Sequence, residues 1–216
     1  CRKAEANPDK YYLLIIDEIN RGNISNIFGE LIFLLESSYR HSDYAVELQY
    51  TGERLWVPEN LLIIGTMNST DKSAVDIDLA LRRRFSIINL YPNALAINEK
   101  LTELGVEVAL PDGTIIDMSK VLEGLNSIIS GNVGLGDDFQ IGQAFLLPQE
   151  GKEYNEHYLL KAWNYKIIPL LNEYVQLSPS LKGELSNMGF NIKNGRIQAF
   201  TTTEMFSAMQ QLSGIV

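Results

Sequence analysis

The sequence has few of the residues that bind metals through sulfur or imidazole. Its 216 residues include one cysteine, Cys1, and two histidines, His41 and His157. A single cysteine cannot form an intramolecular disulfide, and zinc sites made of four cysteines, or of cysteines with histidines, need more ligands than this chain has. The two histidines lie far apart in the sequence. The counts therefore exclude disulfide-stabilised scaffolds and zinc modules.

Long apolar runs and positive charge are also scarce. The longest apolar stretches, such as residues 11–16 and 61–64, fall far below the roughly 20 residues that a membrane helix needs, and the chain does not open on an apolar signal segment. We therefore expect a cytoplasmic protein with no membrane partner. The net charge is −9, from 18 Lys and Arg against 27 Asp and Glu. This balance argues against a surface that grips nucleic acid as a whole, because phosphate contacts need clustered cations.

The apolar residues predict an α/β core followed by a helical unit. Hydrophobic residues make up 45% of the chain, enough for a sizeable core. The runs 11–16 and 61–64 show no alternation, which is typical of strands buried on both faces of a parallel sheet. Between and after them the pattern predicts a helix at 24–35, a hairpin at 44–57, a short helix at 75–83 and a strand at 85–90. We place the α/β core at residues 1–91.

Residues 92–216 are expected to be mainly helical. An apolar stripe begins at Met118, with Asp117 available to cap it. The long apolar helix at 157–174 should be kinked by Pro169. Shorter helices are expected at 94–104 and 203–212.

Polar residues follow the predicted strands, where an α/β sheet places its functional groups. Asp17 and Glu18 end the first strand. An acidic residue there can hold Mg²⁺, directly or through water, and a second carboxylate can orient or deprotonate an attacking water. Asn68 ends the next strand and can bond a phosphate oxygen or a water. Taken singly, an acidic pair is commonly just a polar strand end, and an asparagine commonly sits in a turn.

A run of three arginines, Arg82 to Arg84, precedes the strand expected at 85–90. Three consecutive cations are usually a solvated surface patch. A guanidinium also fits the terminal phosphate of a nucleotide, because its planar donors match the phosphate oxygens.

These features occur together in an order that resembles a known family. Leu13 to Asn23 (LLIIDEINRGN), Ile63 to Asp71 (IIGTMNSTD) and Asp78 to Phe85 (DLALRRRF) closely resemble the AAA+ module of the McrB family, the nucleotide-driven motor of restriction systems specific for modified DNA such as 5-methylcytosine. The hairpin at 44–57 is similar to an insertion shared with the MoxR-like branch. The helical remainder is similar to the AAA+ lid.

The resemblance implies roles for five residues. Asp17 and Glu18 match the Walker B pair, with Asp17 supporting Mg²⁺ and Glu18 positioning the attacking water. Asn68 matches sensor 1, which senses the γ-phosphate. Arg83 and Arg84 match the arginine-finger region, which acts on the nucleotide of the neighbouring subunit.

The resemblance also implies cofactors and partners. These are Mg²⁺ with GTP or ATP, a homo-oligomeric, hexameric ring, a McrC-like nuclease subunit, and DNA bound through a domain outside this chain. After Gly142 the family commonly has His-Ser-Tyr, where this chain has Gln143 to Phe145. The resemblance therefore carries no sensor 2 role to these residues.

The P-loop motif G-x-x-x-x-G-K-[ST] does not occur in the sequence. Without its backbone cradle and its lysine, nucleotide phosphates lack their main binding site. In AAA+ modules the P-loop precedes the Walker B strand, so we expect this chain to be the C-terminal part of a longer protein and to be inactive alone. Two alternatives stay open: a MoxR-like AAA+ chaperone that remodels proteins, and an interaction module without a P-loop. A G-K-[ST] motif encoded upstream would exclude the interaction module.

Overall fold

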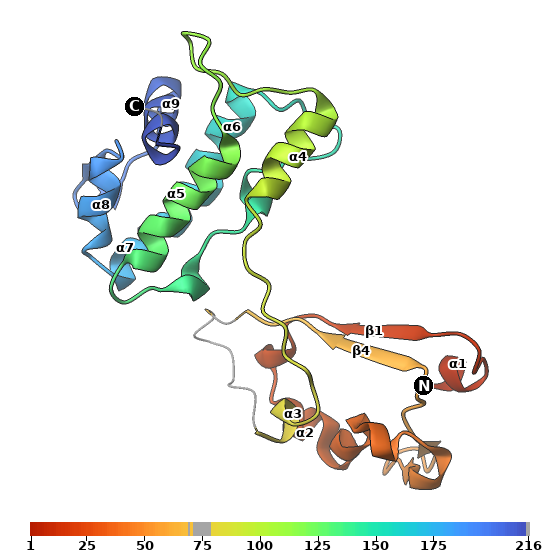
Figure 1. The fold of residues 1–216 in the computed structure, drawn as a ribbon. Coiled ribbons are helices and arrows are strands. Elements are labelled where there is room, and N and C mark those ends of the chain that lie inside the picture. Colours follow the sequence, from red (N-terminus) through yellow and green to blue (C-terminus); the bar gives the residue numbers. More distant parts are fainter. Residues whose placement is uncertain (69, 71–78, 215–216) are drawn as a thin grey trace. The chain divides into compact units, whose positions relative to one another are not determined.

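The computed structural model of the protein describes residues 1–68, 70 and 79–214 (Figure 1). The chain divides into two compact units, Cys1–Asn89 and Leu90–Val216. The division lies two residues before the boundary that the sequence analysis placed between residues 91 and 92. Each unit is described by itself below. No helix in the described part of the chain is long and apolar enough to cross a membrane.

The first unit contains a small parallel sheet with short helices. Its strands β1 and β4 pair in parallel, from Tyr12 opposite Leu61 to Ile16 opposite Gly65. The elements are α1 (Arg2–Glu5), β1 (Tyr12–Ile16), α2 (Ile24–Phe28), a 3₁₀ segment (Gly29–Leu35), β2 (Val46–Glu47), β3 (Arg54–Leu55), β4 (Leu61–Gly65) and α3 (Leu79–Arg82). The predicted hairpin is present as the antiparallel pair β2–β3, and the helix predicted at 24–35 is α-helical only in its first part. Of the helix predicted at 75–83, residues 75–78 lie outside the described residues.

One face of the β1–β4 pair is partly covered, with Leu14 still 43% exposed, and the other face is exposed. Leu61 and Ile63 pack into small apolar clusters with residues such as Leu34. On the opposite face, four alternating side chains are 49–60% exposed: Leu13, Ile15, Leu62 and Ile64. The prediction that these strands are buried on both faces is therefore wrong for the described chain. The packed helices and loops partly cover one side of a two-stranded sheet and leave the other without a covering layer.

The predicted strand at 85–90 is absent. Residues 86–90 have no regular secondary structure, and Ile88 and Leu90 are 79% and 92% exposed. An extended segment becomes a strand when its backbone groups pair with a neighbour. None of the described residues pairs with this segment, so its apolar, β-branched sequence has strand propensity without a partner.

The second unit is helical and holds the larger core. Its elements are α4 (Leu95–Leu104), α5 (Met118–Gly131), α6 (Glu156–Ala162), a π-helical turn (Trp163–Ile167), α7 (Ile168–Leu177), α8 (Leu181–Asn187), the hairpin β5–β6 (Ile192–Lys193 and Arg196–Ile197) and α9 (Thr202–Leu212). Helix α5 contacts α4, α8 and α9. The predicted apolar stripe of α5 is confirmed, since Met118, Val121, Leu122, Leu125 and Ile129 are fully buried.

Polar side chains fix the ends and loops of this helical unit. Asp117 caps α5, accepting hydrogen bonds from the backbone N–H groups of Ser119 and Lys120. Burial opposes ionisation of the Asp117 carboxyl, but these bonds, together with those from the side chains of Ser119 and Asn98, lower its pKa. The cap read from the sequence is therefore confirmed.

Three asparagine side chains form pairs of hydrogen bonds with the backbone of residues distant in the sequence. Each one both donates to and accepts from a single distant residue: Asn126 binds Ile141, Asn164 binds Phe200 and Asn172 binds Ile197. Each amide satisfies one backbone N–H and one backbone C=O of its partner residue.

The helix from Glu156 to Leu177 contains a π-helical turn instead of a simple break. The turn covers Trp163–Ile167 and directly precedes Pro169. A proline has no N–H and cannot bond the carbonyl four residues earlier, so the helix must change its pattern at this point. The structure shows a widened turn before Pro169. The kink of the helix axis expected from the sequence stays a prediction.

Candidate functional site

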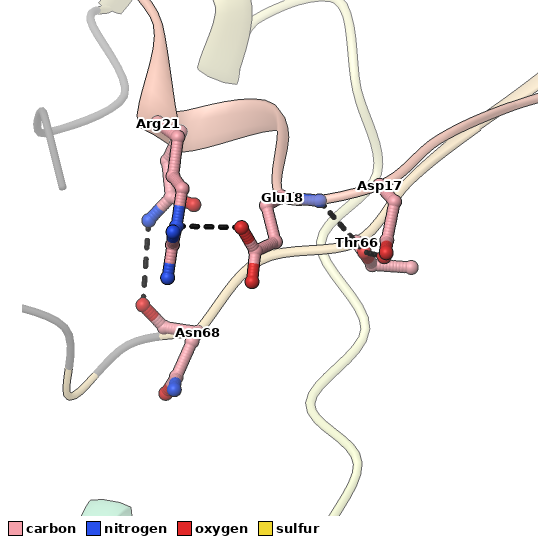
Figure 2. A network of polar contacts seen from close by, with 6 residues as sticks. Asp17, Glu18, Arg21, Thr66 and Asn68 are labelled. Carbon is pink, nitrogen blue, oxygen red and sulfur yellow. Dashed lines mark hydrogen bonds and ion pairs between the residues drawn. The ribbon is translucent and has the colours of Figure 1, made fainter.

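Thr66 ties the ends of the two parallel strands together. It follows β4, and its hydroxyl donates to the Asp17 carboxylate and accepts a 3.1 Å bond from the Glu18 N–H. Its backbone continues the pairing, because the Thr66 N–H donates to Ile16 O at 3.0 Å and Thr66 O accepts from the Ile19 N–H at 2.8 Å. Figure 2 shows Asp17 and Glu18 leaving β1 around this threonine. Thr66 thus holds the segment of the acidic pair through both its hydroxyl group and its backbone.

Glu18 adopts a backbone conformation that few residues other than glycine adopt. Its φ and ψ are 50° and 49°, in the left-handed region, which costs an ordinary residue roughly 1–2 kcal/mol. Such strain is maintained where surrounding contacts demand it, commonly at functional sites. The Glu18 side chain forms an ion pair of 2.5 Å with Arg21, and both side chains are about half exposed. The turn therefore projects the Glu18 carboxylate away from β1 and into reach of a cation.

Asn68 lies beside the same turn. Its backbone carbonyl accepts a 3.3 Å hydrogen bond from the Asn20 side chain. Its own side-chain oxygen accepts bonds from the N–H and the hydroxyl of Thr70, at 3.2 and 2.8 Å. The structure thus brings the predicted sensor residue Asn68 together with the acidic pair, through contacts that join the loops after β1 and β4.

The arginine run splits into an anchored residue and an exposed one. Arg84 forms a 2.7 Å ion pair with Glu36, and the two side chains are 16% and 37% exposed. Arg83 lies one residue past the end of α3 and is exposed. Nearby Leu81 is buried against Ile19, which follows the acidic pair. Arg83 and Arg84, which match the same motif in the sequence, therefore have different surroundings in the structure.

The described residues fit a magnesium ion held jointly with phosphate. In the described part of the chain no three His, Cys, Asp or Glu side chains gather as a metal site. Mg²⁺ seldom needs such a cage, since one or two carboxylates, water and substrate phosphates commonly complete its shell. Asp17 offers an exposed carboxylate at a strand end, with the Thr66 hydroxyl beside it. This donor set is hard and oxygen-based, as the ion requires.

Gln143 has a structural contact within the helical unit. It opens a 3₁₀ turn (Gln143–Phe145), and its side-chain oxygen accepts a 3.1 Å hydrogen bond from the Asn93 N–H. Gln143 thus holds the segment that leads into α4.

Comparisons with known proteins match both units. Residues 2–85 match the family model described as "AAA domain (dynein-related subfamily)", and residues 117–178 match "McrB, alpha-helical lid domain". The chain is 36% identical over 187 residues to the "Type IV methyl-directed restriction enzyme EcoKMcrB subunit" of Escherichia coli (strain K12), a match that covers 81% of this chain and 39% of that protein. The chain belongs to the McrB family of AAA+ proteins.

A second relative of this McrB-family chain is also a restriction protein. The "Type II restriction enzyme BsuMI component YdiS" of Bacillus subtilis (strain 168) is 34% identical over 96 residues, 39% of this chain and 28% of that protein. The chain thus spans about two fifths or less of the length of these relatives.

Sequence reasoning missed three residues that shape the candidate site. Thr66 and Asn20 hold the acidic pair and Asn68 in place, and Glu36 anchors Arg84. Thr66 and Asn20 lie inside the motif segments, so their position next to strand ends was an available signal. Glu36 lies 48 residues before Arg84 in a segment without a motif, and no local pattern identifies it.

Proposed function

We propose that this chain is part of an AAA+ nucleoside-triphosphatase motor that hydrolyses GTP or ATP and drives DNA translocation in modification-dependent restriction. The motor would work in the cytoplasm as a homo-oligomeric, hexameric ring. A McrC-like nuclease subunit would cut the DNA, and a domain outside this chain would bind it. Membership of the McrB family and the two restriction relatives support this proposal.

The observation that carries the proposal is the threonine-centred junction of the two strand ends. Thr66 holds Asp17 and Glu18 there, and the Asn20 side chain ties the backbone of Asn68 to the same turn, where an α/β sheet places its catalytic groups. In the proposed reaction Glu18 orients the attacking water, and Asn68 contacts the γ-phosphate or that water. Asp17 would hold Mg²⁺, directly or through water, and the ion would supply charge neutralisation at the phosphates.

The Arg21–Glu18 ion pair fits this scheme. A catalytic carboxylate must be free to accept a hydrogen bond from water, so Arg21 has to yield when the reaction is set up. An exposed ion pair contributes little, typically 0.2–1 kcal/mol. Opening it is therefore a small step compared with the chemical barrier.

Glu18→Gln in the full-length protein tests the function. The change removes the charge of one carboxylate and keeps its shape, so we expect turnover to be abolished and nucleotide binding to persist. Steady-state phosphate release and equilibrium titration with GTP and with ATP measure the two properties. A Glu18→Gln protein that keeps a near-normal kcat would contradict the role of Glu18.

The chain by itself, without the P-loop motif, is expected neither to bind nor to hydrolyse either nucleotide. Calorimetric titration of the 216-residue chain with GTP and with ATP, in the presence of Mg²⁺, measures this. Micromolar binding would contradict the assigned need for a phosphate cradle. A full-length protein without any nucleotide hydrolysis would instead favour the interaction module.

A further inference from the structure

Residues 81, 84 and 85, which lie three or four positions apart, hold the turn that carries the three arginines in place. Leu81 is buried in the apolar cluster with Ile19 and Leu35, and Phe85 packs against the same cluster. Between them, Arg84 reaches Glu36. The N–H groups of Arg84 and Phe85 both donate to Leu81 O, at 2.9 and 3.1 Å, and close the turn. Positions 81, 84 and 85 therefore face the body of the first unit.

The same helical geometry directs position 83 outward. Residues three and four apart share one side of a helical turn, whereas neighbouring residues point elsewhere. Arg83 is exposed, while Arg84 has a side chain 16% exposed that is engaged with Glu36. A guanidinium that must reach across a subunit interface has to be exposed, and one that is half-buried in an ion pair with its own chain is suited to hold the turn.

We propose that Glu36 is a positioning residue for the arginine finger: it anchors Arg84, and this anchor aims Arg83 at the nucleotide of the neighbouring subunit. This inference rests on the proposed function and divides the arginine pair into a finger, Arg83, and an anchor, Arg84. Glu36 does not touch the nucleotide. It acts through the turn, because the ion pair and the buried Leu81 together set the direction of Arg83.

Conservative substitutions in the full-length protein separate the finger from the anchor. Arg83→Lys loses the planar donors that match phosphate oxygens, so we expect a loss of kcat that approaches the 10³–10⁵-fold contribution of an arginine finger. Arg84→Lys keeps a cation that can pair with Glu36, so kcat should stay within about tenfold of the parent, since exposed and partly exposed pairs tolerate this exchange when no bidentate contact is needed. The reverse order, with Arg84→Lys the more damaging, would make Arg84 the finger and overturn the proposal.

Glu36→Gln tests the positioning residue itself. A displaced reactive group costs up to about 10²-fold in rate. We expect kcat to fall by about tenfold or more and KM for the nucleotide to change by less than about twofold. Glu103→Gln is the control, because Glu103 forms an exposed ion pair with Lys100 in the other unit, and it should leave kcat unchanged. A parent-like kcat for Glu36→Gln would overturn the proposal.

Mixed rings show on which side of the interface the Glu36 defect acts. A ring of Glu36→Gln and Glu18→Gln subunits should recover activity, since some interfaces combine an intact Glu18 with an intact finger. A ring of Glu36→Gln and Arg83→Ala subunits should not recover. The opposite pattern would place Glu36 with the Glu18 side and overturn the inference.

Further measurements distinguish a failure of the Glu36 inference from a failure of the proposed function. The charge-exchanged double variant Glu36→Arg with Arg84→Glu should restore turnover lost in Glu36→Gln, and failure to restore it in a folded ring counts against the anchor. If Glu18→Gln and Arg83→Ala abolish hydrolysis while all variants at 36 and 84 behave as the parent, the inference fails and the proposed function stands. If the unmodified protein hydrolyses no nucleotide, the proposed function itself fails.

Discussion

Replacing Gly124 by alanine tests how closely helices α5 and α9 approach each other in the lid. Gly124 lies inside α5, where a glycine costs about 0.5–1 kcal/mol relative to alanine. On propensity alone, Gly124→Ala should stabilise the protein. A β-carbon on Gly124 would, however, lie 2.9 Å from the carbonyl carbon of Leu212 in α9, and closer still to its oxygen.

The size of the effect follows from this distance. Ordinary van der Waals contact begins at 3.4 Å, and the Leu212 oxygen is the nearest atom, so the backbone of α9 would have to retreat by more than about 1 Å. A backbone cannot rotate away as a side chain can, and α9 buries Met205, Ala208 and Met209 in the same core. Overpacking of this kind costs about 1–3 kcal/mol. After the gain in helix propensity, we expect Gly124→Ala to lose roughly 1–2 kcal/mol of unfolding free energy.

Urea unfolding followed by tryptophan fluorescence measures this loss. The chain has two tryptophans. Trp163 is fully buried in the lid beside Phe190 and Phe200, so a Trp56→Phe background makes the signal specific for the lid. Gly183→Ala is the matched control: it lies in α8 with nothing within 4 Å of the added carbon, and it should gain about 0.5–1 kcal/mol. A Gly124→Ala lid as stable as that of Gly183→Ala would refute the close approach of the two helices.

Three further changes test contacts of the site and the lid. Thr66→Val in the full-length protein removes the hydroxyl that holds Asp17, so kcat should fall with little change in thermal stability, as enzyme assay and melting curves would show. Asp117→Ala should cost the lid about 1 kcal/mol at neutral pH in urea titrations. Because the folded-state pKa of Asp117 is lowered, this difference should be full above the unfolded-state pKa of about 4 and shrink as the pH falls through the folded-state value. Asn126→Ala leaves the backbone N–H and C=O of Ile141 without their partner and should cost about 2–5 kcal/mol, more than Asp117→Ala in the same titration.

The local sequence pattern was sufficient to predict the elements whose signals lie within their own residues. The stripe that begins at Met118 and the cap at Asp117 identify α5 because helical burial repeats every three to four residues. The run before Asp17 identifies β1, and the three-residue loop around Gly52 identifies the hairpin. Each of these signals is contained within about 15 residues.

The sequence pattern gave a wrong prediction where an element depends on a partner that is distant in the sequence. Residues 85–90 contain two adjacent isoleucines, as β4 does. They nevertheless form no strand, because strand formation needs a neighbouring backbone. The same reasoning applies to burial. The run at 11–16 predicts a strand correctly, but whether both its faces are covered depends on layers that its own residues do not encode.

In the candidate site, too, some residues could be predicted from local sequence and others could not. Asp17, Glu18 and Asn68 could be proposed from sequence because the carboxyl ends of parallel strands meet at one edge. The different surroundings of Arg83 and Arg84 could not, since they depend on Glu36. The left-handed backbone of Glu18 also has no sequence signal, because glutamate seldom adopts it.

The three motif segments rest on one small apolar cluster, which would let them act together in the proposed reaction. Ile16 and Ile19 flank the acidic pair, Ile63 lies on the strand that leads to Asn68, and Leu81 and Phe85 flank the arginines; all five pack in the same cluster. Packed interiors do not deform continuously, so a displacement of any one motif disturbs the support of the other two. Phosphoryl transfer depends mainly on positioning and electrostatic stabilisation. In the proposed reaction, this shared support would fix the relative places of the groups assigned to position the water, contact the phosphate and reach the next subunit, although these groups come from segments up to about 65 residues apart.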